Sequence, residues 1–202
     1  MVALGLIGAA AGYGLGVLRQ EEPATFAAEP VLASSPSYPV TPVVVLPDPD
    51  LPALEPGLAL HEATVGTAPF EFRLPIPQGW DQTNPMAGEW HWHPPPEFVP
   101  NTYFIRVKML GNQFQPVAKA LDARISALEN ADDVIDLHVE SRDADSFVAS
   151  YVSGQYRRVA MEKFVPDGEG STYASIAAIG REEDRAGLAD LFERIPPGAV
   201  TP

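Results

Sequence analysis

Proline is distributed unevenly along this chain, and its distribution limits which segments can fold. Nine of the 22 prolines fall between Pro23 and Pro56. Each proline removes a backbone donor and holds its preceding residue in extended conformations. The same part of the chain, residues 20–68, holds seven acidic residues and no Lys or Arg. We therefore expect residues 20–68 to form an acidic, extended stalk in polyproline II conformation, without a core of its own.

An uncharged run precedes this proline-rich segment. Val2 to Leu18 contains no charged residue. At about 1.5 Å per residue, a helix of that length spans roughly 25 Å, near the lower limit for crossing a bilayer core. The run lacks a basic N-terminal region and is longer than the apolar part of a typical signal peptide. We expect residues 1–19 to be an uncleaved transmembrane anchor, with a cleaved signal peptide as the alternative.

The anchor carries glycines at intervals of four, namely Gly8, Gly12 and Gly16. Small residues at this spacing let two helices approach closely, which predicts a homodimer through the anchor. The alternative is that glycine is simply common in such anchors. Arg19 weakly favours a cytoplasmic C-terminal flank, but a long acidic stalk is more usual outside. We expect a single-pass protein of the cell membrane whose C-terminal domain lies outside the cytoplasm.

Charge and cysteine content exclude several kinds of site. The formal net charge is −14, and nucleic-acid affinity comes mainly from cationic contacts with phosphate. Nucleic acid is therefore not an expected partner. The chain has no cysteine, which excludes disulfides, thiolate metal ligands and a cysteine nucleophile.

From residue 69 the hydrophobic pattern becomes periodic. Alternating apolar residues indicate strands, and apolar residues three or four apart indicate helices. In the strand expected over residues 134–142, the pattern places Ile135, Leu137 and Val139 inward. Tight turns such as Ser153-Gly154 make the later strands antiparallel. Residues 69–202 thus predict an α+β domain, a mainly antiparallel sheet with helices packed on it. The expected strands are 70–74, 89–93, 103–110, 134–142, 147–152, 155–165 and 172–179, and the expected helices are 113–130 and 182–195.

This order of elements, with Pro77-Gln78-Gly79-Trp80 after the first strand, resembles the PsbP-like α/β/α sandwich group, which includes the LpqN-like lipoproteins of actinobacteria. The resemblance covers about residues 69–197 and rests on element order. It implies binding or scaffolding at a cell envelope and supplies no catalytic residue. This chain has no lipid-bearing cysteine, so its membrane attachment would come from the N-terminal helix.

One short strand gathers side chains that could recognise a ligand. Alternation places Glu89, His91 and His93 on one strand face, with Trp90 and Trp92 on the other. Two histidines and a carboxylate could ligate zinc, but a closed structural site needs four ligands. We interpret this face as a surface recognition patch and expect a chelator to leave folding unchanged. The double change of both histidines to alanine is expected to leave the melting temperature nearly unchanged.

Basic residues offer a further interpretation. Arg157, Arg158 and Lys163 would form an anion site with Arg106 and Lys108 if their strands were neighbours, whereas pairing with acids across strands is the alternative. The aspartates near residues 132–145 lack the pattern of a calcium loop. No nucleophile elbow or phosphate-binding glycine loop is found, and we expect no cofactor.

These features together predict a membrane-tethered, extracytoplasmic binding or scaffolding domain of the cell envelope, without catalysis. Its expected partner is another envelope protein. One alternative is a sensory or carrier domain that binds a small apolar ligand between helix and sheet. Another is a metal-dependent enzyme that uses the His91 face.

Overall fold

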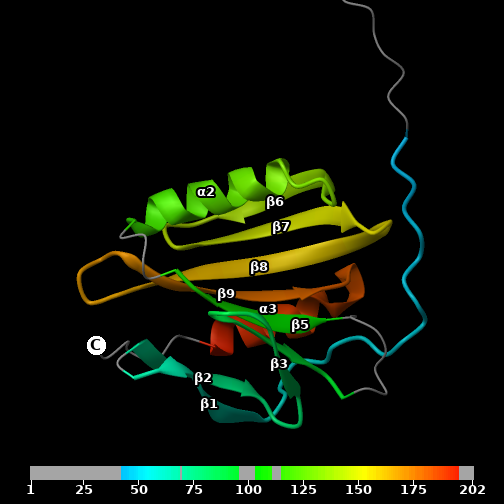
Figure 1. Ribbon diagram of the computed structural model, residues 1–202. Helices are drawn as coiled ribbons and strands as arrows, with labels where there is room; N and C mark the ends of the chain where they lie inside the picture. The colour runs from blue at the N-terminus through cyan, green and yellow to red at the C-terminus, as the bar shows by residue number, and fades with distance from the viewer. Residues whose placement is uncertain (1–41, 69, 96–102, 111–114, 196–202) are drawn as a thin grey trace, which may run out of the picture. The chain divides into compact units, whose positions relative to one another are not determined.

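The computed structural model describes residues 42–68, 70–95, 103–110 and 115–195. Over these residues the chain forms two antiparallel sheets and two α-helices, which confirms the predicted α+β class (Figure 1). The elements follow in the order β1 (Leu60–Thr67), β2 (Phe70–Pro77), β3 (Asp81–Met86), β4 (Glu89–His93), β5 (Phe104–Met109), α2 (Val117–Glu129), β6 (Ile135–Arg142), β7 (Ser146–Ser153), β8 (Tyr156–Pro166), β9 (Thr172–Gly180), the 3-10 turn η1 (Glu182–Asp184) and α3 (Arg185–Arg194).

The main sheet has the strand order β3-β4-β5-β9-β8-β7-β6, with every neighbouring pair antiparallel. β9 lies at its centre, and all nine of its residues are buried. Small side chains at Ala174, Ser175, Ala177 and Ala178 let other elements pack closely against this strand on both faces. Strands β1 and β2 form a separate two-stranded sheet.

The two faces of the main sheet pack against different elements. On one face, Ile105, Val107 and Ile176 form a core with α3 residues Leu188 and Leu191 and with the β1–β2 hairpin. On the other face, α2 lies along β6 to β8 (Figure 1). Its apolar stripe packs against Phe147 and Phe164 through Ala120, Leu121 and Leu128. The helices therefore cover opposite faces of the sheet.

Helix α2 begins at Val117, four residues later than the sequence pattern predicts. Pro116 precedes it with φ −57° and ψ 147°. Proline disfavours helical geometry in the residue before it, so the helix cannot extend back through Gln115 without strain.

The segment before β1 is attached to the domain by a buried ion pair. We call residues 48–54 the clasp. Arg181 and Asp184 are both fully buried, and two of the Arg181 guanidinium nitrogens bond the two Asp184 oxygens at 2.8 and 2.9 Å. The Asp184 Oδ1 atom also accepts a bond of 2.9 Å from the backbone N–H of Leu54. The remaining Arg181 donors bond clasp carbonyls, at 3.2 Å for Pro49, 3.2 Å for Leu51 and 3.0 Å for Pro52.

The structure therefore differs from the predicted boundary between stalk and domain at residue 69. Leu54 is 4% exposed within the main core, and β1 pairs along its whole length with β2. Proline enrichment indicates an extended backbone, but an extended backbone can still pack against a domain or be held by side-chain donors. The C-terminal part of the proline-rich segment, residues 48–67, belongs to the fold.

The predicted orientation of Ile135 is wrong. Its side chain is 52% exposed, whereas Leu137 and Val139 are partly buried. Asp136 has φ 53°, and the β6–β7 register shifts between Ile135 and His138. A bulge of this kind breaks the alternation of faces, so Ile135 turns outward.

The predicted anchor, with Gly8, Gly12 and Gly16, lies outside the described residues. Within the ranges that are described, no helix is both long enough and apolar enough to span a membrane.

Candidate functional site

A cavity of about 260 Å³ lies between α2 and the part of the main sheet formed by β5, β9 and β8. Small side chains on both walls leave this space open. Ala123 and Ala127 line it from adjacent turns of α2, and Ser175 lines it from β9. The full lining is Arg106, Lys108, Leu110, Gln115, Ala120, Ala123, Arg124, Ala127, Glu162, Phe164, Thr172 and Ser175.

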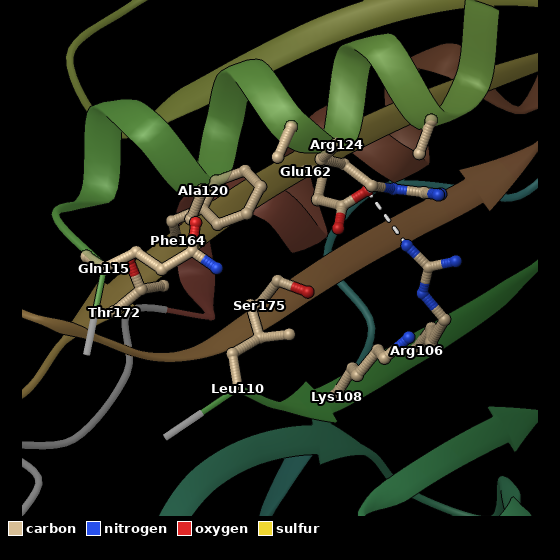
Figure 2. Close-up of a pocket in the computed structure, with 12 residues that line it drawn as sticks. Arg106, Lys108, Leu110, Gln115, Ala120, Arg124, Glu162, Phe164, Thr172 and Ser175 are labelled. Carbon is tan, nitrogen blue, oxygen red and sulfur yellow. Dashed lines mark hydrogen bonds and ion pairs between the residues drawn. The ribbon is translucent and has the colours of Figure 1, made fainter. Parts of the chain in front are cut away.

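Three basic side chains reach this cavity from two elements. Arg106 and Lys108 are two residues apart on β5 and therefore share one face of the sheet, while Arg124 comes from α2 (Figure 2). In the sheet, Arg106 lies opposite Ala177, and Ala177 lies opposite Glu162 of the next strand. Because the Ala177 side chain is a single methyl group, Arg106 can cross β9 to reach Glu162.

Glu162 is the counter-ion of the two arginines. Its side chain is 1% exposed, and its Oε2 atom accepts hydrogen bonds of 2.9 Å from Arg106 Nη2 and 2.9 Å from Arg124 Nε. Burial raises the pKa of Glu162, but the positive charges of Arg106 and Arg124 and hydrogen bonds from Arg124 and Ser175 outweigh burial, so the pKa is lowered. The carboxylate is therefore ionised at neutral pH, where it cannot act as a general acid.

Several donors of this basic cluster are not used by Glu162. The Arg106 Nε atom is buried and has no hydrogen-bond partner in the described part of the chain. Lys108 makes no ion pair or hydrogen bond with any described residue, and its side chain is exposed. The lining thus carries three positive charges and one negative charge in a chain of net charge −14. Such a local excess of positive charge favours an anionic ligand.

The predicted recognition face adjoins this cavity. The structure places Glu89, His91 and His93 on one face of β4, and His91 lies opposite Arg106 in the β4–β5 register. His91 Nε2 lies 2.7 Å from Glu89 Oε1. The Phe104 ring lies 5.2 Å from the His91 ring and 5.4 Å from the His93 ring, between centroids.

This face is less open than the sequence pattern predicts. Glu89 is only 9% exposed, and both histidines are partly buried. Burial lowers the pKa of His93, and the charge of His91 lowers it further. His93 is therefore mostly neutral at neutral pH. Among the described residues, no group of three or more His, Asp or Glu side chains is placed to hold a metal ion.

The five basic residues considered from the sequence do not form one site. Arg157 pairs with Asp136 at 2.8 Å, and Arg158 pairs with Asp48 of the clasp at 2.7 Å. Lys163 lies on the opposite face of the sheet, over the Phe192 ring of α3. Only Arg106 and Lys108 meet at the cavity.

Two charged residues of the cavity, Arg124 and Glu162, were not predicted from the sequence. Arg124 appears on the polar side of the helical pattern, which gives no sign that it bends toward the sheet. Glu162 could have been predicted from the sequence, because strand alternation places it on the same inward face as Ala160 and Phe164. A carboxylate at such a position needs a buried cationic partner.

Compared with models of known protein families and with curated proteins, the sequence matches none.

Proposed function

We propose that this protein is a membrane-tethered, extracytoplasmic binding domain of the cell envelope, and that the cavity beside α2 is its binding site. The observation that carries the proposal is the cluster of Arg106, Lys108 and Arg124 around a preformed cavity. The domain would be held outside the membrane by residues 1–19 and the proline-rich segment. The resemblance to PsbP-like and LpqN-like domains, also a proposal, agrees with such a role.

The chemistry of the cavity supports binding over catalysis. Its one carboxylate, Glu162, is ionised and held by two arginines. Of the two hydroxyls in the lining, Thr172 donates to the Gln115 carbonyl, and Ser175 donates to Glu162, whose lowered pKa makes it a poor base. A hydroxyl nucleophile without an effective base is weak. The arrangement can therefore orient and neutralise a ligand, but it offers no paired acid and base.

The small apolar ligand considered from the sequence is less well supported. A cavity exists between helix and sheet, as that alternative requires, but three cationic side chains line it. Burying these charges against an apolar ligand would cost free energy without a compensating contact. We therefore favour a polar ligand, or a polar group of a protein partner.

Topology can be tested with a reporter fused after Pro69. Alkaline phosphatase should be active there if the domain lies outside the cytoplasm. Activity of a cytoplasmic reporter at the same position, with an inactive phosphatase, would contradict the proposed location.

Binding can be tested by native mass spectrometry of the full-length chain purified from its own membrane. Ala123→Trp fills the cavity, and Ala186→Trp adds the same bulk to an exposed alanine of α3. The proposal expects a bound component in the wild-type chain and in the α3 variant, and its loss in the cavity variant. Equal occupancy in all three chains, or none in any, would contradict a binding role for the cavity.

A further inference from the structure

We propose that the cavity recognises an oxyanion, the carboxylate or phosphate group of a small ligand, with Lys108 as the side chain that determines charge selectivity. This inference rests on the proposed binding function and names the chemistry of its ligand. It follows from how the donors of the basic cluster are distributed between the fold and the cavity.

Glu162 uses only part of the available donor capacity. It accepts one hydrogen bond from Nη2 of Arg106 and one from Nε of Arg124. A guanidinium group has five N–H donors in a fixed plane. Glu162 thus fixes the orientation of both guanidinium groups and leaves their other N–H groups for a ligand. Preorganised donors of this kind bind an oxyanion without the entropy cost of ordering flexible side chains.

Lys108 is the basic residue of the cluster that Glu162 does not bond. Its cross-strand neighbour Glu89 is engaged with His91 instead. On the other side, Lys108 lies opposite Ser175 of β9, which also lines the cavity. An ammonium group that bonds no described residue, beside two oriented guanidinium groups, matches a ligand of one or two negative charges.

The size of the cavity limits the ligand. Its volume of about 260 Å³ lies just below the ~300–1,000 Å³ of pockets that bury drug-sized ligands. The wall opposite Arg106 and Lys108 is formed by α2, through Ala120, Ala123 and Ala127 beside Arg124. The ligand we infer therefore carries its oxyanion toward β5 and a short, weakly polar remainder toward α2.

The test is a titration of the full-length chain, in non-ionic detergent at low ionic strength, with inorganic phosphate and separately with succinate. Isothermal titration calorimetry should show saturable binding of at least one probe. The probe that binds more tightly indicates whether the natural ligand carries a phosphate or a carboxylate. Lys108→Gln should weaken that binding about ten- to a hundredfold, the usual effect of losing one charge-assisted hydrogen bond.

Lys119→Gln is the matched control, because Lys119 is an exposed lysine of α2 that does not line the cavity. It removes the same charge and should change affinity less than about twofold. Both variants should melt within about one degree of wild type, since neither lysine side chain bonds another residue in the described ranges. No saturable binding of either probe, or equal weakening by both variants, would overturn the inference. A bound component that Ala123→Trp displaces but that carries no oxyanion would overturn it while leaving the proposed function intact.

Discussion

Glu162 Oε2 lies 2.9 Å from Arg106 Nη2, across the single methyl side chain of Ala177 on the strand between them. Arg124 of α2 bonds the same oxygen. One buried carboxylate thus joins β5, β8 and α2, and the shape of the cavity depends on it.

Glu162→Gln should therefore lower the free energy of unfolding by about 3 kcal/mol at pH 7, because two partly buried cations lose their buried counter-charge. The folded-state pKa of Glu162 is below its ordinary value of 4.5, so its ionised form stabilises the fold above that pH. The stabilisation is lost as pH falls below 4.5 through the folded-state pKa.

Urea denaturation of both chains between pH 7 and pH 3 checks this prediction. The difference between wild type and variant should shrink as pH falls. Glu169→Gln, at an exposed turn, is the control and should change little at any pH. A difference between wild type and Glu162→Gln that stays constant down to pH 3 would contradict the assigned ion pair.

The contact between Glu89 and His91 changes what is expected of the histidine face. The Glu89 side chain is 12% exposed, and its partner is His91. His91→Ala should therefore cost about 1–3 kcal/mol, because a nearly buried carboxylate loses its hydrogen bond. This revises the expectation from sequence that removing both histidines leaves the melting temperature nearly unchanged.

Thermal melts of His91→Ala and of His138→Ala, an exposed histidine of β6, compare the two positions. A chelator should shift neither melt, and a chelator-induced fall in the wild-type melting temperature would instead indicate a metal site.

Gly187 of α3 lies directly against the clasp. A Cβ atom there would overlap the carbonyl oxygen and Cγ of Leu54. Replacing glycine with alanine stabilises an exposed helix by about 1 kcal/mol. Here the overlap should make the same replacement destabilising. We expect Gly187→Ala to destabilise the domain by about 1–3 kcal/mol and to speed proteolytic cleavage between residues 42 and 58. Gly168→Ala, where the added atom meets open space, is the control. Unchanged cleavage and stability in Gly187→Ala would show that Leu54 does not pack on α3.

Two truncated chains can test whether the domain begins at the predicted boundary or at the observed one. A chain that starts at residue 42 retains the clasp and β1, whereas one that starts at residue 69 loses the buried side chains of Leu54 and Val65. Burial of each is worth about 1.5–3 kcal/mol. The longer chain should melt cooperatively, and the shorter chain should be at least about 3 kcal/mol less stable. Indistinguishable denaturation curves would place the boundary at residue 69.

The sequence pattern predicts the strongly periodic elements because their burial is periodic. The bounds predicted for β4 match those observed, and the turn between β7 and β8 lies where expected. β3 was not predicted because all six of its residues are exposed, so its pairing with β4 leaves no hydrophobic signal. β1 was not predicted because Val65 is its one buried residue.

The cavity was only partly predictable for a different reason. Alternation places Arg106 and Lys108 on one face of β5. Whether Arg157 or Arg124 joins them depends on strand order and on where α2 lies, and neither is encoded in local periodicity.

The clasp also determines where mechanical load enters the domain. A pull from the N-terminal side first reaches the hydrogen bond of 2.8 Å that the Leu46 N–H donates to the Gln155 carbonyl, then the pair of Asp48 with Arg158, and then the Arg181–Asp184 pair. Residues 48–54 are held by side chains of β8 and of the segment that joins β9 to α3, so tension is delivered to the central strands before it reaches β1. In single-molecule pulling from the N-terminus, the first rupture should release roughly the length of residues 48–58 and leave the main sheet intact. A single rupture of the whole domain would show that the clasp and the sheet fail together.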